Sequence, residues 1–258
     1  MIECQVRAAL AVILAVGCGS NDSPAKLFGA PTTNTGLSST ECGASCPGFT
    51  PPSYGQEDFD ALADMVLTEP LPELSSDPYS DPGAFPSEPD ALCGVVPTGS
   101  SSYRLQTFSS IEDLDGAGAT VTHHGACGQC STLQDLLVYM RDGDLAGPVR
   151  ECGLADLGAS AEELAACIEN IGFSPGCALI WAYNSVNTRR ACLEPCLAAL
   201  GEPYQAEDGS LNPCIQCDED LSGPVFKAVA GRTRRNSGLP SALCRPCDSV
   251  APVVHDYR

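Results

Sequence analysis

Two histidines and a C-x-x-C motif lie side by side in the middle of the chain. Residues 123–130 read His-His-Gly-Ala-Cys-Gly-Gln-Cys and hold two of the three histidines. A strand is predicted at 119–123 and a helix directly after Cys130, so the motif precedes a helix N-terminus. There the helix dipole stabilises a thiolate, which would make Cys127 the nucleophile and Cys130 the resolving thiol. A protonated His124 would add positive charge. The alternative is a structural disulfide at a helix start.

The order strand, C-x-x-C, helix resembles the active site of thioredoxin-like oxidoreductases. Cys127-Gly128-Gln129-Cys130 is similar to their C-G-P-C motif, with Gln in place of Pro. Ala126 stands where the family has an aromatic residue. The resemblance implies thiol–disulfide exchange by Cys127 and Cys130, and a cis-proline downstream, for which Gly223-Pro224 is the candidate.

The same residues also resemble the nucleophile motif of papain-like cysteine proteases. That resemblance implies Cys130 as nucleophile and His255 as general base, with His124 in place of the oxyanion-hole glutamine. Only three residues follow His255, too few for the strands and the asparagine that complete that fold. A cysteine hydrolase is therefore ranked third, below a redox role.

The 16 cysteines indicate where the protein resides. A chain of 258 residues can build a core without disulfides, so this density favours an oxidising compartment. Nine apolar residues follow Arg7, which has the length of a signal-peptide core, and we assign residues 1–17 to a signal peptide. Leu14-Ala15-Val16-Gly17-Cys18 resembles the lipobox of bacterial lipoproteins, which implies cleavage before Cys18 and a lipid on its thiol. An ordinary secretory signal is the alternative.

Cysteine parity agrees with this interpretation. Removing Cys4 with the signal and lipidating Cys18 leaves 14 cysteines, an even number that can all pair in disulfides. Cys214-x-x-Cys217 and Cys244-x-x-Cys247 also have the outline of a four-cysteine zinc site. In an oxidising compartment disulfides are preferred, so we expect no cofactor and keep zinc as a minority alternative.

Charge narrows the range of partners. The formal net charge is −20, with 33 acidic and 13 basic residues, which disfavours nucleic acid. No later apolar run has the length of a membrane span, so membrane attachment is expected only through the lipid on Cys18. Arg232, Arg234 and Arg235 stand out in so acidic a chain and are candidates for binding a small anionic ligand. A protein partner is equally open.

These sites must be positioned by a mixed set of elements. Strands are predicted at 103–108, 119–123 and 225–229. Helices are predicted from capping boxes at Ser131 and Ser160 and from Ser174-Pro175. The acidic, proline-rich stretch before residue 103 is expected to be largely irregular, with one short helix around residues 59–67.

The predicted architecture is α+β: a single disulfide-rich domain at 42–258 with a cysteine-stapled helical middle region and a loop-rich, acidic N-terminal third. Residues 18–41 are small and polar and are expected to form a flexible, lipid-anchored tether. The preferred function is a lipid-anchored extracytoplasmic protein of the cell envelope with a non-catalytic binding or structural role. The alternative is the thiol–disulfide oxidoreductase.

Overall fold

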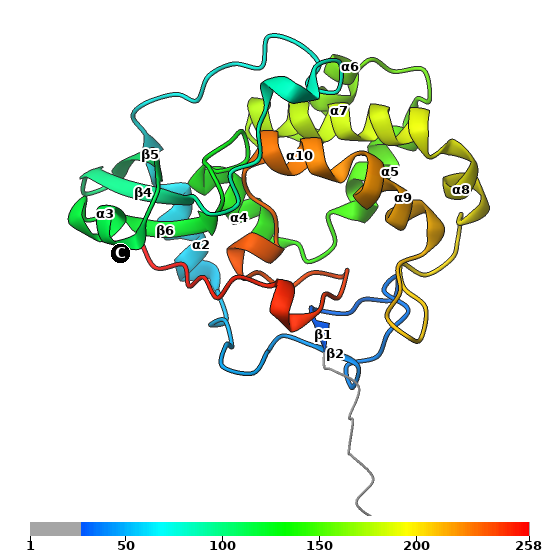
Figure 1. Cartoon of the computed structure of the whole chain (residues 1–258), viewed down its shortest axis with the longest axis horizontal. Helices are drawn as coiled ribbons and strands as arrows, with labels where there is room; N and C mark the ends of the chain where they lie inside the picture. Colours follow the sequence, from blue (N-terminus) through cyan, green and yellow to red (C-terminus); the bar gives the residue numbers. More distant parts are fainter. Residues whose placement is uncertain (1–26, 258) are drawn as a thin grey trace, which may run out of the picture.

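The computed structural model describes residues 27–257, and its architecture is α+β, as the sequence predicts (Figure 1). The signal peptide, the lipobox with Cys18 and residues 18–26 of the expected tether lie outside the described residues. A helical region occupies one side of the molecule, and a small sheet occupies the other.

The larger sheet has four strands in the order β3-β5-β4-β6, with β4 antiparallel to both of its neighbours. The strands are β3 (Val66–Leu67), β4 (Leu92–Gly99), β5 (Ser102–Phe108) and β6 (Thr120–His124). The predictions at 103–108 and 119–123 are confirmed. Strand β4 is not predicted from the sequence, because it lies next to the acidic, proline-rich stretch and itself contains Pro97. Its buried residues Cys93, Val95 and Val96 explain why it forms.

Helices are the most frequent regular elements of the described residues, and α7 lies against both α6 and α10 (Figure 1). The helices are α2 (Gln56–Ala63), α3 (Ile111–Gly116), α4 (Leu133–Arg141), α5 (Ala146–Ala155), α6 (Ala161–Glu169), α7 (Pro175–Ala191), α8 (Leu193–Ala198), α9 (Pro213–Leu221) and α10 (Gly223–Ala230). Short 3-10 turns are η1 (Pro82–Ala84), η2 (Arg235–Ser237) and η3 (Cys247–Ser249).

Local start signals place several of these helices. The capping box of Ser160 and Glu163 is present at α6, and Pro175 occupies the first turn of α7. Helix α4 starts one residue later than predicted, because Thr132 caps it by accepting a hydrogen bond from the Asp135 N–H at 3.0 Å. The short helix predicted in the acidic stretch is α2, which ends before β3.

The prediction of a strand at 225–229 is wrong, because these residues belong to helix α10. The helix begins at Gly223-Pro224. Proline has no backbone N–H, but in the first turn of a helix this donor has no partner within the helix, so its absence costs nothing. Phe226, Val229 and Ala230 then share a buried face at helical spacing. The two valines had suggested a strand, but burial on a single helical face decides the local conformation.

Residues 27–41, assigned from sequence to the tether, pack against the C-terminal part of the chain. Strand β1 (Leu27–Phe28) pairs in parallel with β2 (Cys42–Gly43), and Phe28 also bridges to Arg245. Phe28 is buried, and the hydroxyl of the buried Thr35 donates to the Ala242 carbonyl at 2.7 Å. The fold therefore extends at least to Leu27, and the expected boundary at residue 42 lies inside it.

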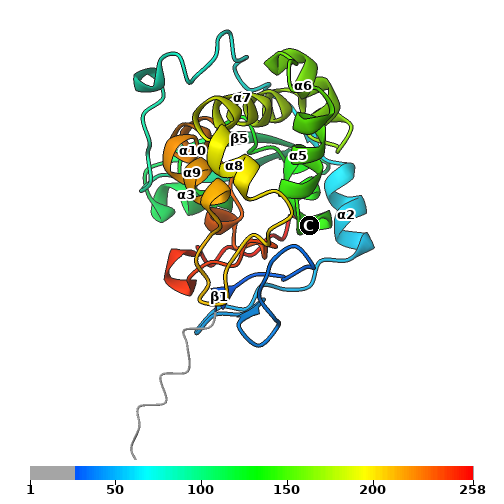
Figure 2. The ribbon, with the colours of Figure 1, turned by 90° about the vertical axis from the view of Figure 1, so that its right-hand side faces the viewer.

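All 14 cysteines of the described residues form disulfides, as parity suggested. The pairs are Cys42–Cys244, Cys46–Cys247, Cys93–Cys127, Cys130–Cys177, Cys152–Cys167, Cys192–Cys217 and Cys196–Cys214. Four of them staple the helical region, where α5, α8 and α9 gather on the side shown in Figure 2. Disulfides at this density indicate an oxidising, extracytoplasmic compartment.

Candidate ligand-binding pocket

The two cysteines of the central C-x-x-C motif are not bonded to each other. Cys127 pairs with Cys93 of β4, and Cys130 pairs with Cys177 of α7. Cys130 and Cys177 are fully buried. A disulfide exchange site needs the two motif cysteines to alternate between dithiol and mutual disulfide. The structure instead uses each of them to join a different element, as structural disulfides do.

The other features of the redox and protease interpretations are also placed elsewhere. No cis peptide bond occurs among residues 27–257, and Pro224 lies in the first turn of α10. His124 is exposed at the end of β6. His255 is buried with its Nε2 at 2.8 Å from the Ser237 carbonyl, and burial lowers its pKa to about 3. With Cys130 in a disulfide, His255 has no thiol to activate.

His123, not singled out in the sequence, is the histidine with a nucleophile-type neighbour. Its Nε2 lies 2.7 Å from Ser131 Oγ, and its Nδ1 lies 2.9 Å from the His124 carbonyl. Both His123 and Ser131 are fully buried. Burial and the nearby Arg232 lower the pKa of His123 well below its usual range. The pair fixes the end of β6 against the start of α4 and offers no access to a substrate.

The arginine cluster is divided by the fold. Arg232 is fully buried and makes five hydrogen bonds, to both oxygens of Thr122, to the carbonyls of Cys130 and Ser131, and to Ser237 Oγ. Arg234 donates to the carbonyls of Tyr139, Pro240 and Asp142. The guanidinium groups of Arg232 and Arg234 are thus occupied by the protein's own oxygens. Arg235 forms an ion pair with Glu219 at 2.9 Å.

The cysteines of the zinc alternative are occupied as well. Cys214, Cys217, Cys244 and Cys247 belong to four different disulfides. Within residues 27–257, no group of three or more histidine, cysteine, aspartate or glutamate side chains is arranged to hold a metal ion. A zinc site built from these four cysteines is therefore not formed.

A cavity of about 390 Å³ lies among α5, α7, α8, α9, α10 and residues 233–245. This volume lies within the range of about 300–1,000 Å³ typical of small-molecule pockets. The walls are mainly apolar and include Leu145, Val149, Leu164, Ile215, Phe226 and Leu239. Five leucines that line it are each more than half exposed: Leu154, Leu157, Leu193, Leu197 and Leu200. The cavity is therefore a largely apolar space with an apolar rim.

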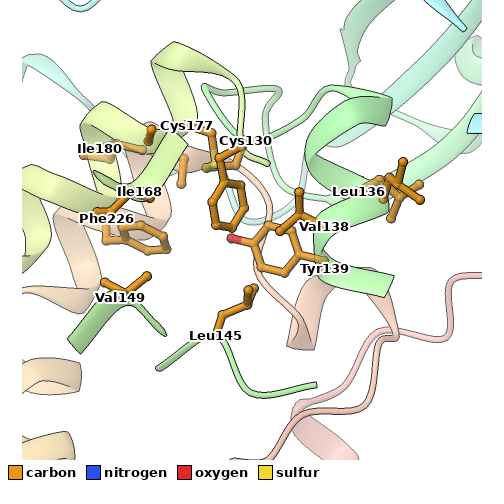
Figure 3. Packing of buried hydrophobic residues seen from close by; sticks show 14 of the residues in the cluster. Cys130, Leu136, Val138, Tyr139, Leu145, Val149, Ile168, Cys177, Ile180 and Phe226 are labelled. Atoms are coloured by element: carbon orange, nitrogen blue, oxygen red, sulfur yellow. A yellow bond between two sulfur atoms is a disulfide. The ribbon is translucent and has the colours of Figure 1, made fainter. Parts of the chain in front are cut away.

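Two buried polar atoms in the wall of this cavity, Tyr139 Oη and Trp181 Nε1, have no hydrogen-bond partner of good geometry among the described residues, although the indole N–H lies near the phenol oxygen. Figure 3 shows the Tyr139 hydroxyl directed toward the space between Phe226, Val149 and Leu145. Burial raises the pKa of Tyr139 to about 12, although hydrogen bonding from the Trp181 side chain acts to lower it. The indole N–H can only donate, so the proton of the Tyr139 hydroxyl still lacks an acceptor. The phenol is therefore protonated at neutral pH and presents an O–H donor to the cavity. An unpaired buried donor costs about 1–3 kcal/mol, so it marks a place for an acceptor oxygen from a ligand.

A charged group lies in the same cavity wall. Glu219 of α9 forms ion pairs with Lys227 at 3.0 Å, Arg235 at 2.9 Å and Arg245 at 2.5 Å. Burial acts to raise the pKa of Glu219, but the three cations outweigh it, and the pKa is lowered. At the neighbouring Asp218, burial dominates and raises the pKa, despite hydrogen bonds from Thr188 and Asn184. We refer to Glu219, Lys227, Arg235 and Arg245 as the basic corner of the cavity.

Comparison with known proteins finds a family match in the C-terminal part of the chain. Residues 161–253 match a family of unknown function, DUF8771. This segment contains α6 to α10 and therefore much of the cavity wall. No curated protein and no solved structure matches the chain. No helix among residues 27–257 combines the length and apolar character needed to cross a bilayer.

Replacing Arg232 with methionine tests its structural role. Arg232→Met leaves the carbonyls of Thr122, Cys130 and Ser131 without their donor, so we expect the free energy of unfolding to fall by about 3–5 kcal/mol. Urea unfolding with the disulfides intact measures this change in unfolding free energy. Arg190→Met is the control: it removes an exposed guanidinium with a single side-chain hydrogen bond, to Asn187 at 2.7 Å, and should change stability by less than about 1 kcal/mol. A loss below about 1 kcal/mol for Arg232→Met would contradict the assignment.

Removing the unpaired hydroxyl of Tyr139 should increase the free energy of unfolding, in contrast to Arg232→Met. Tyr139→Phe deletes a buried donor without an acceptor, so we expect the ligand-free protein to gain about 1 kcal/mol in unfolding free energy. Tyr103→Phe is the matched control, because the Tyr103 hydroxyl accepts a hydrogen bond from the Leu133 N–H at 2.8 Å. That variant should lose stability. Equal losses in both variants would show that the Tyr139 hydroxyl is satisfied in solution.

Proposed function

We propose that this protein is a non-catalytic extracytoplasmic binding protein whose cavity holds an apolar small molecule carrying at least one acceptor oxygen. The observation that carries the proposal is the apolar cavity of about 390 Å³ with the unpaired hydroxyl of Tyr139 directed into it. Apolar walls with a small number of polar groups are the usual composition of a ligand pocket.

The disulfides support this role by fixing the cavity walls before a ligand arrives. Cys152–Cys167 joins α5 to α6, and Cys196–Cys214 joins α8 to α9. Cys130–Cys177 joins the start of α7 to the segment before α4. A pre-formed site loses little conformational entropy on binding, which favours affinity. The disulfides therefore stabilise the fold and also keep the cavity in a shape that can bind a ligand.

We further propose that the mature chain is attached to the membrane of the cell envelope through a lipid on Cys18. In Cys18→Ser, the protein should move from the membrane fraction to the soluble extracytoplasmic fraction. Cys4→Ser is the control, because Cys4 is expected to leave with the signal peptide. Mass spectrometry of the mature N-terminal peptide measures the modification directly, and an unmodified thiol at Cys18 would refute the anchor.

Binding in the cavity can be followed with N-phenyl-1-naphthylamine, a neutral apolar dye that becomes fluorescent in apolar surroundings. Trp181 is the single tryptophan of the chain and lines the cavity, so its emission should change as the dye binds. We expect saturable binding at one site. Gly153 of α5 lines the cavity, and a Cβ placed there meets no atom within 4 Å. Gly153→Phe should therefore fill the space and weaken dye binding at least tenfold without loss of folding.

Gly116→Phe is the control for this substitution. Gly116 ends α3, away from the cavity, and its Cβ would also meet no atom within 4 Å. This variant should bind the dye as the parent protein does. If the parent protein does not bind the dye, or if Gly153→Phe binds it unchanged, the proposed pocket function is wrong.

A further inference from the structure

The basic residues of this acidic protein are concentrated at one cavity. The whole chain has 13 basic and 33 acidic residues. Six of those 13 basic residues line the cavity: Arg150, Arg189, Lys227, Arg234, Arg235 and Arg245. Of the 33 acidic residues, three line it: Asp144, Asp218 and Glu219. The cavity lining is thus positive by formal charge, while the chain as a whole is strongly negative.

The excess positive charge is clearest at the basic corner. Three cationic side chains converge on the single carboxylate of Glu219. One negative charge balances only one of them, which leaves a formal charge of +2 among these four side chains. The neighbouring Asp218 directs its carboxylate to Asn184 and Thr188 and, among the described residues, forms no ion pair with the three cations. Three cations around one anion constitute a site that a second anion would complete.

Two of these cations also remain accessible. The side chains of Lys227 and Arg235 are 40% and 29% exposed, whereas that of Arg245 is 13% exposed. Arg232 and Arg234, by contrast, are occupied by main-chain carbonyls. A ligand anion in the cavity would therefore be met by Lys227 and Arg235, while Arg245 stays with Glu219.

The same cavity joins this charge to apolar surface. Phe226 lies one position before Lys227 on α10, and the exposed leucines of α5 and α8 line the cavity as well. We propose that the ligand is a single-chain amphiphile with an anionic head group, whose head binds at Lys227 and Arg235 and whose chain lies along the leucine-lined part of the cavity. This inference rests on the proposed binding function and specifies its ligand class.

Competition against N-phenyl-1-naphthylamine tests the head group. The competitors share a twelve-carbon chain and differ in charge: laurate and dodecyl phosphate are anionic, dodecanol is neutral, and dodecyltrimethylammonium is cationic. All are used below their micelle concentrations. We expect at least one of the two anions to displace the dye at a concentration about tenfold lower than dodecanol does, and the cation to be weakest. The comparison of laurate with dodecyl phosphate distinguishes a carboxylate ligand from a phosphate ligand.

A double variant tests the site. Lys227→Gln with Arg235→Gln removes two cations and leaves Glu219 paired with Arg245. The advantage of the anion over dodecanol, measured within the variant itself, should fall to within twofold, whatever the change in dye affinity. Arg190→Gln removes an exposed guanidinium that does not line the cavity and should change neither value.

Salt provides a second measurement that needs no substitution. In the parent protein, the anion's affinity should fall as sodium chloride is raised, while that of the dye should not. If the dye binds but dodecanol competes as well as both anions, the inference about charge is overturned and the binding function stands. If the advantage of the anion survives in the double variant, the head group is misplaced. If the dye does not bind at all, the proposed function itself fails.

Discussion

The packing of the chain around the C-x-x-C motif depends on the hydrogen bonds of the buried Arg232 guanidinium. A fully buried cation is tolerated only when its donors are satisfied, and here five hydrogen bonds satisfy it. Its partners belong to β6, to the segment before α4 and to η2, which are distant in sequence. Arg232 therefore joins the sheet, the helical region and the C-terminal part of the chain at one point.

The backbone around Arg232 is packed just as closely. The N–H groups of Gln129 and Cys130 donate to the carbonyls of Val229 and Ala230 at the end of α10. A Cβ on Gly128 would lie 2.3 Å from the Val229 carbonyl oxygen, so no larger residue fits there. The glycine of the C-x-x-C motif is thus explained by close packing against α10, and the motif is part of the protein's frame.

This frame determines the cavity. Helix α10 is held by the contacts at Gly128, and α7 is held to the same segment by Cys130–Cys177. Phe226 and Trp181, whose rings meet edge to face at 4.8 Å, then line the cavity from these two helices. Walls fixed by disulfides and by a buried cation resist collapse, so an apolar space persists that a less cross-linked helical region would tend to fill. The chemistry of the protein follows from that space, which brings apolar walls, an unpaired phenol and a basic corner together.

The sequence by itself determined the properties that depend on composition and on neighbouring residues. The oxidising compartment, the pairing of 14 cysteines, the start signals at Ser160 and Pro175 and the strands around 103–108 and 119–123 are all local or additive signals. Only the tertiary structure decided which cysteines pair and how residues 27–41 pack. It also decided that residues 223–230 form a helix and that the three arginines of the cluster have different partners. Tyr139, Trp181 and Glu219 gave no local signal of a site, because each matters through groups distant in sequence. Solvation and long-range contacts decide whether an arginine is buried or binds a ligand, and they exist only once the chain has folded.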